Sequence, residues 1–217
     1  MESVIQTLAI YAIPVVFAIT LHEAAHGYVA RHFGDPTAWM LGRISLNPLR
    51  HVDPVGTVLV PAVLFWATHG SFLFGWAKPV PVDFGKLRQP KKDMFWVAAA
   101  GPAANLAMAL AWATLLKLVE LAPDNVYSLP MARMADAGID VNIVLMVLNL
   151  FPLPPLDGGR IAVSLLPPRA AWRFAQLERW GFPILLLLMA SGMLGAVLGP
   201  FVGLFRLLIA AVFRFHY

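Results

Sequence analysis

The sequence predicts an all-α integral membrane protein, a polytopic helical bundle of about four to six transmembrane segments. The chain is 59% hydrophobic and only 13% charged, with a mean hydropathy of +0.72, whereas soluble domains carry about 25% charged residues. The apolar residues also fall into several long runs, and no internal repeat is visible. A short membrane-associated β-hairpin or re-entrant element is expected to accompany the helices.

The first element expected is one long helix over residues 4–33. It is mostly apolar and ends in two basic residues, Arg31 and His32, before a Gly-Asp-Pro turn that stops it. Because about 20 residues span a bilayer, a helix of this length is tilted or projects beyond the membrane. The N-terminus lacks a basic region and a small-residue cleavage site, so we interpret the run as a retained span.

Two short elements are expected next. Over residues 37–53, apolar and polar residues roughly alternate, which is typical of a short strand or hairpin near the membrane surface. Residues 55–68 are apolar but short for a span, and basic residues flank them on both sides. Because positive loops stay in the cytoplasm, we predict a re-entrant hairpin; an ordinary span is the alternative. Residues 72–90, rich in Gly and Pro, are expected to be a loop or extended strand.

The second half of the chain contains three further apolar runs. Residues 94–119 form a strong candidate span that opens with small residues, which let helix backbones approach closely in lipid. Residues 141–151 form the next run and end in a proline-broken segment, after which four arginines return the chain to the cytoplasm. Residues 182–213 are either one broken span or a tight pair of helices.

Composition restricts the partners and the metal chemistry. The formal charge is +4 and the pI is about 9.7, but the 16 basic residues are scattered between apolar runs. This distribution suits cytoplasmic loops better than a nucleic-acid surface. The chain has no cysteine, so any bound metal must use His, Asp or Glu.

The motif His-Glu-Ala-Ala-His at residues 22–26 lies inside the first apolar run. On a helix, two histidines four residues apart lie on one face. Their imidazoles can bind one Zn²⁺ while Glu23 takes a proton from a metal-bound water. Ionisable side chains in a lipid-compatible run are costly and need a purpose. The motif therefore predicts a zinc protease with its active site in the membrane.

A hydrolytic zinc site needs a third protein ligand and an open position for water. Most other acidic residues lie in expected surface loops, among arginines, or in the net-negative loop expected after residue 119, and Asp35 is too close to the same helix end. That acidic loop holds Glu120, Asp124, Asp136 and Asp140. Asp157 remains, in a segment whose prolines prevent a regular helix. Because unwound backbone at membrane depth is tolerated where it lines a cavity, Asp157 is the predicted third ligand. A helix cap or turn is the alternative role.

Three ordered motifs resemble the site-2 protease family, peptidase family M50. They are the HEAAH motif, Gly-Pro-Ala-Ala-Asn at 101–105, and Asn-Leu-Phe-Pro at 149–152 running into Pro-Leu-Asp-Gly-Gly at 155–159. With Asn-Pro at 47–48 and His-Val-Asp-Pro at 51–54, the chain looks like the compact form of this family, which lacks a PDZ or CBS domain. The resemblance covers about residues 15–180.

The resemblance implies an intramembrane zinc metalloendopeptidase that hydrolyses peptide bonds in or near transmembrane segments of substrate proteins. One Zn²⁺ per chain would be its cofactor. Its partners would be transmembrane proteins and membrane lipid, with no nucleic acid. Residues 1–217 would form a single membrane-embedded metalloprotease domain, with a catalytic core over about 4–168 and a C-terminal helical tail over about 180–214. The location would be multi-pass in the cell (inner) membrane, if the chain is bacterial.

The same resemblance implies roles for particular residues. It assigns His22, His26 and Asp157 as metal ligands and Glu23 as the catalytic general base. It also places two neutral amides in the catalytic cavity, where they would hold the substrate backbone or the oxyanion. These are the side chains of Asn105 and Asn149.

Other interpretations stay open. A non-proteolytic membrane protein that binds or transports zinc would use the same ligands. Asn105 and Asn149 could instead form hydrogen bonds between packed helices. His51 and Asp53, beside Pro54, fit a turn. The sequence indicates neither the substrates, the oligomeric state nor the substrate gate.

Overall fold

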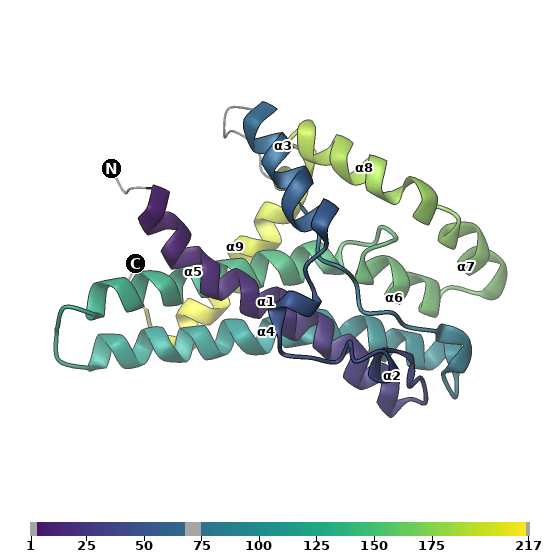
Figure 1. Cartoon of the computed structure of the whole chain (residues 1–217), viewed down its shortest axis with the longest axis horizontal. Coiled ribbons are helices and arrows are strands. Elements are labelled where there is room, and N and C mark those ends of the chain that lie inside the picture. Colours follow the sequence, from purple (N-terminus) through teal and green to yellow (C-terminus); the bar gives the residue numbers. More distant parts are fainter. Residues whose placement is uncertain (1–3, 68–74, 216–217) are drawn as a thin grey trace.

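The computed structural model describes residues 4–67 and 75–215, and within these ranges all regular structure is helical (Figure 1). Three long helices form the centre: α1 (Val4–His32), α4 (Pro90–Leu121) and α5 (Ser128–Leu150). α4 and α5 run antiparallel and are joined by a short turn, while α1 crosses and contacts both. The all-α fold class is confirmed.

Shorter elements complete the described chain. In order they are α2 (Thr37–Met40), the 3-10 turn η1 (Pro48–Arg50), the π-helical turn η2 (Pro54–Leu59), α3 (Val60–Ala67), the 3-10 turn η3 (Phe84–Lys86), α6 (Asp157–Leu165), α7 (Pro168–Ala175), α8 (Glu178–Ala190) and α9 (Met193–Phe213). α9 packs against α4 and α5, whereas α3 and α8 extend away from the central helices (Figure 1).

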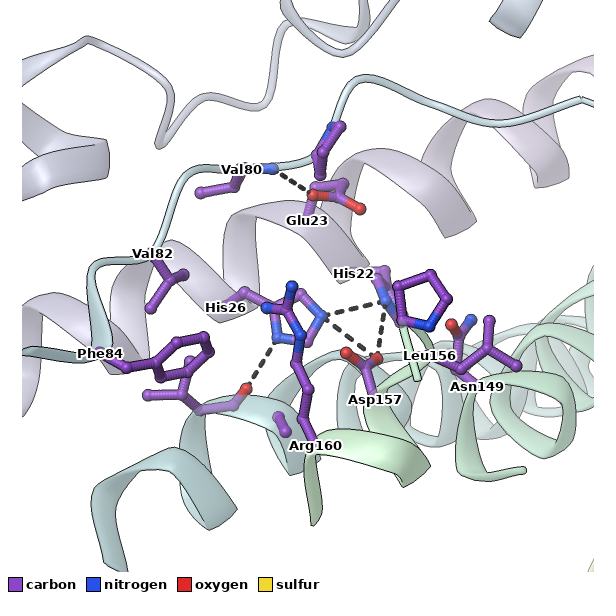
Figure 2. A pocket seen from close by; sticks show the side chains of 14 residues that line it. His22, Glu23, His26, Val80, Val82, Phe84, Asn149, Leu156, Asp157 and Arg160 are labelled. Carbon is purple, nitrogen blue, oxygen red and sulfur yellow. Dashed lines mark hydrogen bonds and ion pairs between the residues drawn. The ribbon is translucent and has the colours of Figure 1, made fainter. Parts of the chain in front are cut away.

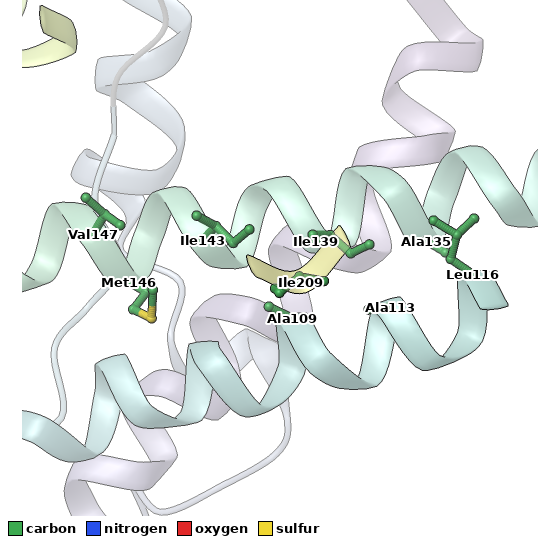
Figure 3. Close-up of a cluster of buried hydrophobic side chains, with 9 residues drawn as sticks. All are labelled: Ala109, Ala113, Leu116, Ala135, Ile139, Ile143, Met146, Val147 and Ile209. Carbon is green, nitrogen blue, oxygen red and sulfur yellow. The ribbon is translucent and has the colours of Figure 1, made fainter. Parts of the chain in front are cut away.

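The core between α4, α5 and α9 combines alanines with larger aliphatic side chains (Figure 3). Ala109 and Ala113 lie one turn apart on α4 and are fully buried, so the backbone of α5 can approach closely. Ile139 and Ile143 of α5 and Ile209 of α9 fill the space beside them. Because lipid tails are as apolar as these side chains, association in a membrane depends on such close packing.

Among the described residues, three helices are long and apolar enough to cross a membrane: Gln6–His32 within α1, Pro90–Leu121 and Met193–Phe213. These helices fit an integral membrane protein. The predicted number of four to six spans goes beyond them and stays a prediction.

The short strand or hairpin expected over residues 37–53 is not found in the described chain, where this stretch forms α2, η1 and turns. Two local caps explain the difference. Asn47 Oδ1 accepts a hydrogen bond from Leu49 N at 3.0 Å, and Asp53 Oδ1 accepts two bonds, at 3.0 and 2.7 Å, from the backbone two and three residues on. Each cap precedes a proline, which favours the first turn of a helix, so local bonds replace those of a hairpin.

The other short elements were partly predictable. The run at 55–68 forms the apolar helical stretch Pro54–Trp66, which is shorter than the three span candidates. Its return falls at residues 68–74, outside the described residues, so a re-entrant path stays a prediction. The tail at 182–213 is a pair of helices, α8 and α9, joined at Gly192, whose φ of 73° lies in the left-handed region that favours glycine.

Candidate metal centre

Two helices bring the predicted ligands together. α1 carries His22 and His26 four residues apart, and α6 begins at Asp157, directly after the proline-rich turn that follows α5. A Cβ at Gly158 would lie 2.2 Å from the carbonyl oxygen of Leu150, so glycine is needed where the start of α6 packs on the end of α5. This packing places the Asp157 carboxylate against the two imidazoles (Figure 2).

The three side chains converge on one point (Figure 2). The Nε2 atoms of His22 and His26 are 3.1 Å apart, and Asp157 Oδ2 lies 3.2 and 3.3 Å from them. Ligand atoms about 2.0–2.1 Å from a tetrahedral zinc ion are separated by about 3.3–3.4 Å. The triangle therefore has the size of one face of a tetrahedral zinc site, with the fourth corner left for water or substrate.

Hydrogen bonds on the outer side of each ring determine where its proton lies. His22 Nδ1 is 2.6 Å from Oδ1 of Asn105, and His26 Nδ1 is 2.7 Å from the carbonyl oxygen of Val97. Both partners accept, so each Nδ1 carries the hydrogen and each Nε2 presents a lone pair. Asp157 Oδ2 is buried, and no donor from the described part of the chain bonds to it. Three electron pairs at these distances repel one another unless a cation lies among them, so the residues fit a metal ion.

The orientation of the Asn105 amide follows from a chain of buried hydrogen bonds. Asn142 Nδ2 donates to the carbonyl oxygen of Gly138 at 2.8 Å, which leaves Asn142 Oδ1 to accept from Asn105 Nδ2 at 3.0 Å. Asn105 Oδ1 is then the atom that faces His22. Both asparagines are fully buried. This series of hydrogen bonds fixes the ring orientation and tautomer of His22, as outer hydrogen bonds of metal-binding histidines generally do.

The Asp157 carboxylate supplies the negative charge of the centre. A carboxyl group binds a metal in its ionised form, just as an imidazole binds it in its neutral form. The charge and the lone pairs of the three side chains are therefore complementary to a cation.

Glu23 lies between the two histidines along α1 but is not part of the triangle (Figure 2). Its Oε2 accepts a hydrogen bond of 2.6 Å from the backbone N–H of Val80. Its side chain lines the same cavity as the three converging residues. The cavity therefore holds a carboxylate beside the candidate metal site, where a general base must be within reach of water or substrate.

Comparison with curated proteins identifies the family. The chain is 37% identical over 196 residues to a protein of Bacillus subtilis (strain 168) named "Putative zinc metalloprotease YwhC", with 87% of this chain and 83% of that protein covered. It is 32% identical over 176 residues to "Putative zinc metalloprotease Rip2" of Mycolicibacterium smegmatis, and 30% identical over 171 residues to the Rip2 protein of Mycobacterium tuberculosis (strain H37Rv). The chain belongs to this family of zinc metalloproteases.

The relatives differ in how much of them is matched. The two Rip2 alignments cover 81% and 79% of this chain but only 64% and 62% of the relatives. No family model and no solved structure matches the chain. Zinc is the metal that the names of these relatives indicate, and His22, His26 and Asp157 form a group in the described chain that could hold it.

The two asparagines that the sequence placed in the catalytic cavity lie in different environments. The cavity of the metalloprotease has a volume of about 130 Å³, and Asn149 lines it. Asn105 is fully buried, and its amide is bonded to His22 and Asn142. A contact with substrate stays a prediction for Asn149, whereas the contacts of Asn105 favour a role in orienting His22.

His51 and Asp53 make turn contacts. His51 is buried, and its Nε2 donates to the carbonyl oxygen of Ser45 at 2.9 Å. Asp53 caps the following helical turn. These contacts agree with the turn interpretation.

Sequence reasoning missed three contributors to the site. Val80 acts through a backbone N–H, which has no signature in the sequence. Gly101 was noted only for its size; a Cβ there would lie 2.4 Å from His26 Nε2, so α4 packs directly against the histidines. Asn142 could have been found, because it stands seven residues before Asn149 in the same apolar run, two turns along one helix face.

Proposed function

We propose that this chain is an intramembrane zinc endopeptidase of the site-2 protease type, which hydrolyses peptide bonds in or near transmembrane segments of other membrane proteins. The observation that carries the proposal is the position of the site: His22 and His26 lie within the apolar span Gln6–His32. Asp157 reaches them from α6. A hydrolytic centre built into a span meets substrates that are themselves in the membrane.

His22, His26 and Asp157 would hold one zinc ion. When bound, zinc acidifies a water molecule to a pKa of about 7 and polarises the scissile carbonyl group. Glu23 is the general base. The backbone N–H of Val80 bonds to Oε2 of Glu23. The other carboxylate oxygen, Oε1, can therefore accept a proton from the water and deliver it to the leaving amine.

Asn149 is the candidate for contact with the substrate. Its Nδ2 donates to the carbonyl oxygen of Leu145 at 2.9 Å, and the side chain lines the cavity. An amide carries two N–H donors and one acceptor, so a second N–H and the oxygen stay available. A neutral donor in this place can stabilise the negative charge that develops on the carbonyl oxygen.

Substrate helices must unwind locally before cleavage, because a helical backbone uses its carbonyl groups in internal hydrogen bonds. The cavity of about 130 Å³ is smaller than a helix and is lined on one side by the extended residues 79–82. We therefore expect substrates to present a short extended segment. The proposed location is a multi-pass position in the cell membrane.

The experiment is cleavage of a model transmembrane substrate by the purified protein in proteoliposomes, with zinc content measured on the same samples. Glu23→Gln should retain zinc and lose cleavage, whereas Asp157→Ala should lose both. Glu120→Gln is the matched control, because Glu120 pairs with Lys117 near the end of α4. This control should leave zinc content and cleavage unchanged.

Each other outcome points elsewhere. Cleavage by Glu23→Gln would refute the assignment of the general base. Zinc binding by wild-type protein without cleavage of any transmembrane substrate would favour a membrane zinc-binding or transport protein that uses the same ligands. Loss of zinc in both Glu23→Gln and Asp157→Ala would mean that the ligand set differs.

A further inference from the structure

An extended segment, residues 76–82, passes over the catalytic part of α1 and forms one wall of the cavity; we call it the strap (Figure 2). Its first half is bonded to residues 51–56, between the end of η1 and the first turn of η2. Trp76 N donates to the carbonyl oxygen of Gly56 at 3.0 Å, and Lys78 N donates to that of His51 at 2.9 Å. Two backbone bonds therefore hold the first half of the strap to this segment.

Arg43 binds the strap immediately before it reaches the site. Its Nη2 donates to the carbonyl oxygens of Lys78 and Pro79 at 2.9 and 3.3 Å. The next residue, Val80, points its N–H in the opposite direction and donates to Glu23 Oε2 at 2.6 Å. The arginine contact and the contact with the predicted general base thus involve the two ends of one peptide group, Pro79 C=O and Val80 N–H.

The local sequence makes this connection stiff. Val80 stands between Pro79 and Pro81, and a residue that precedes proline is restricted to extended backbone. The strap also lies close to α1: a Cβ at Gly27, one turn after Glu23, would come within 3.2 Å of Val80 Cγ1. A displacement at Pro79 is therefore transmitted to the Val80 N–H with little loss.

We propose that Arg43 is a positioning residue for the hydrolytic reaction: it holds the strap so that the Val80 N–H orients the Glu23 carboxylate toward the cavity. The inference rests on the proposed role of Glu23 as general base. It assigns Arg43 no contact with substrate or metal. Its expected signature is a loss of kcat with KM and zinc content unchanged.

Amide hydrogen exchange tests the contact without any activity. Pro79 and Pro81 have no amide hydrogen, so a peptide over residues 79–82 reports Val80 and Val82 alone. In the metal-free protein, Glu23→Ala and Arg43→Gln should both speed exchange in this peptide. Arg50→Gln is the matched control, because Arg50 donates to the carbonyl oxygen of Gly42 within its own loop. It should leave the exchange as in wild type.

Kinetics test whether Arg43 acts through Val80. Val80→Pro removes the N–H, whereas Val80→Ala keeps it and removes only the side chain. Loss of an orienting hydrogen bond at a metal site costs about 10- to 100-fold in activity, so Arg43→Gln and Val80→Pro should each lower kcat by about that factor, and Val80→Ala by much less. In the Val80→Pro background, Arg43→Gln should cause no further loss, because the link is already broken.

The failures are distinguishable. If wild-type protein cleaves and Glu23→Gln does not, the proposed function stands, and the proposal for Arg43 is tested separately. Equal kcat in Arg43→Gln and Arg50→Gln would overturn it, as would a full additional loss in the double variant. Loss of zinc or a lower unfolding temperature in Arg43→Gln, in parallel with kcat, would show that Arg43 supports the fold instead of positioning Glu23.

Discussion

Gly101 of α4 faces both histidines, so a methyl group there perturbs the metal centre without changing a ligand. An added Cβ would lie 2.4 Å from His26 Nε2 and 2.5 Å from His22 Cε1, whereas carbon contacts have an optimum of about 3.5–4.0 Å. Gly101→Ala therefore forces the rings to move by about 1 Å. They cannot turn freely, because Asn105 and the carbonyl oxygen of Val97 hold their Nδ1 atoms.

The size of the effect follows from this displacement. Metal–ligand distances in a functional site vary by about 0.2 Å, so a shift of about 1 Å is incompatible with the unperturbed geometry. Overpacking costs about 1–3 kcal/mol, and each 1.4 kcal/mol is about a factor of ten in affinity. The zinc affinity of Gly101→Ala is expected to fall about 5- to 150-fold.

Competition with a chromophoric zinc chelator measures this loss directly in detergent-purified protein. The matched control is Gly203→Ala on α9, where an added Cβ would meet none of the described residues within 4 Å, so this variant should bind zinc like wild type. An unchanged zinc affinity in Gly101→Ala would refute the packing of α4 against the histidines. An equal loss of zinc affinity in Gly203→Ala would mean that replacing any helical glycine lowers the affinity, without a specific contact with the histidines.

Two further predictions concern hydrogen bonds of fully buried polar side chains. Asn105→Ala should lower zinc affinity about 10- to 100-fold, because His22 loses the acceptor that orients its ring. Asn142→Ala acts through Asn105 and should lower zinc affinity less in the same competition assay. Burial raises the pKa of Asp35, but hydrogen bonds from Thr37 and Asp83 outweigh burial and lower it. This stabilisation is present above the unfolded pKa of about 3.9 and is lost as pH falls. The unfolding temperature of wild type should therefore fall more steeply below about pH 4 than that of Asp35→Asn.

The long helices could be predicted because they coincide with apolar runs, but their ends depend on tertiary contacts. The apolar run at 141–151 covers only the second half of α5, which begins at Ser128. The first half carries Asp136 and Asp140, which suggested a polar loop. Both pair with Arg206 of α9, and this pairing with a helix far along the chain extends α5 beyond its apolar part.

The grouping of His22, His26 and Asp157 could be predicted for a different reason, which is that few residues were chemically eligible. Without cysteine, the third member had to be a His, Asp or Glu, and Asp157 was the acidic residue that follows a proline-broken apolar run. The roles around the ligands could not be predicted in the same way. The contact between His22 and Asn105 joins residues 83 positions apart, and the partner of Glu23 is a backbone group, which sequence composition does not reveal.

The arrangement explains how an apolar span accommodates three ionisable residues. With one divalent ion bound, both histidines would be neutral, and the negative charges of Asp157 and Glu23 would balance the charge of the ion. His22, His26 and Glu23 each have a partner for the polar atom that faces away from the centre. An isolated charge at membrane depth costs about 2.5–3.5 kcal/mol or more, whereas the group with its ion would be neutral as a whole. The hydrogen bonds and the charge balance that make the centre tolerable in lipid therefore also leave its remaining ligand atoms free to bind the metal.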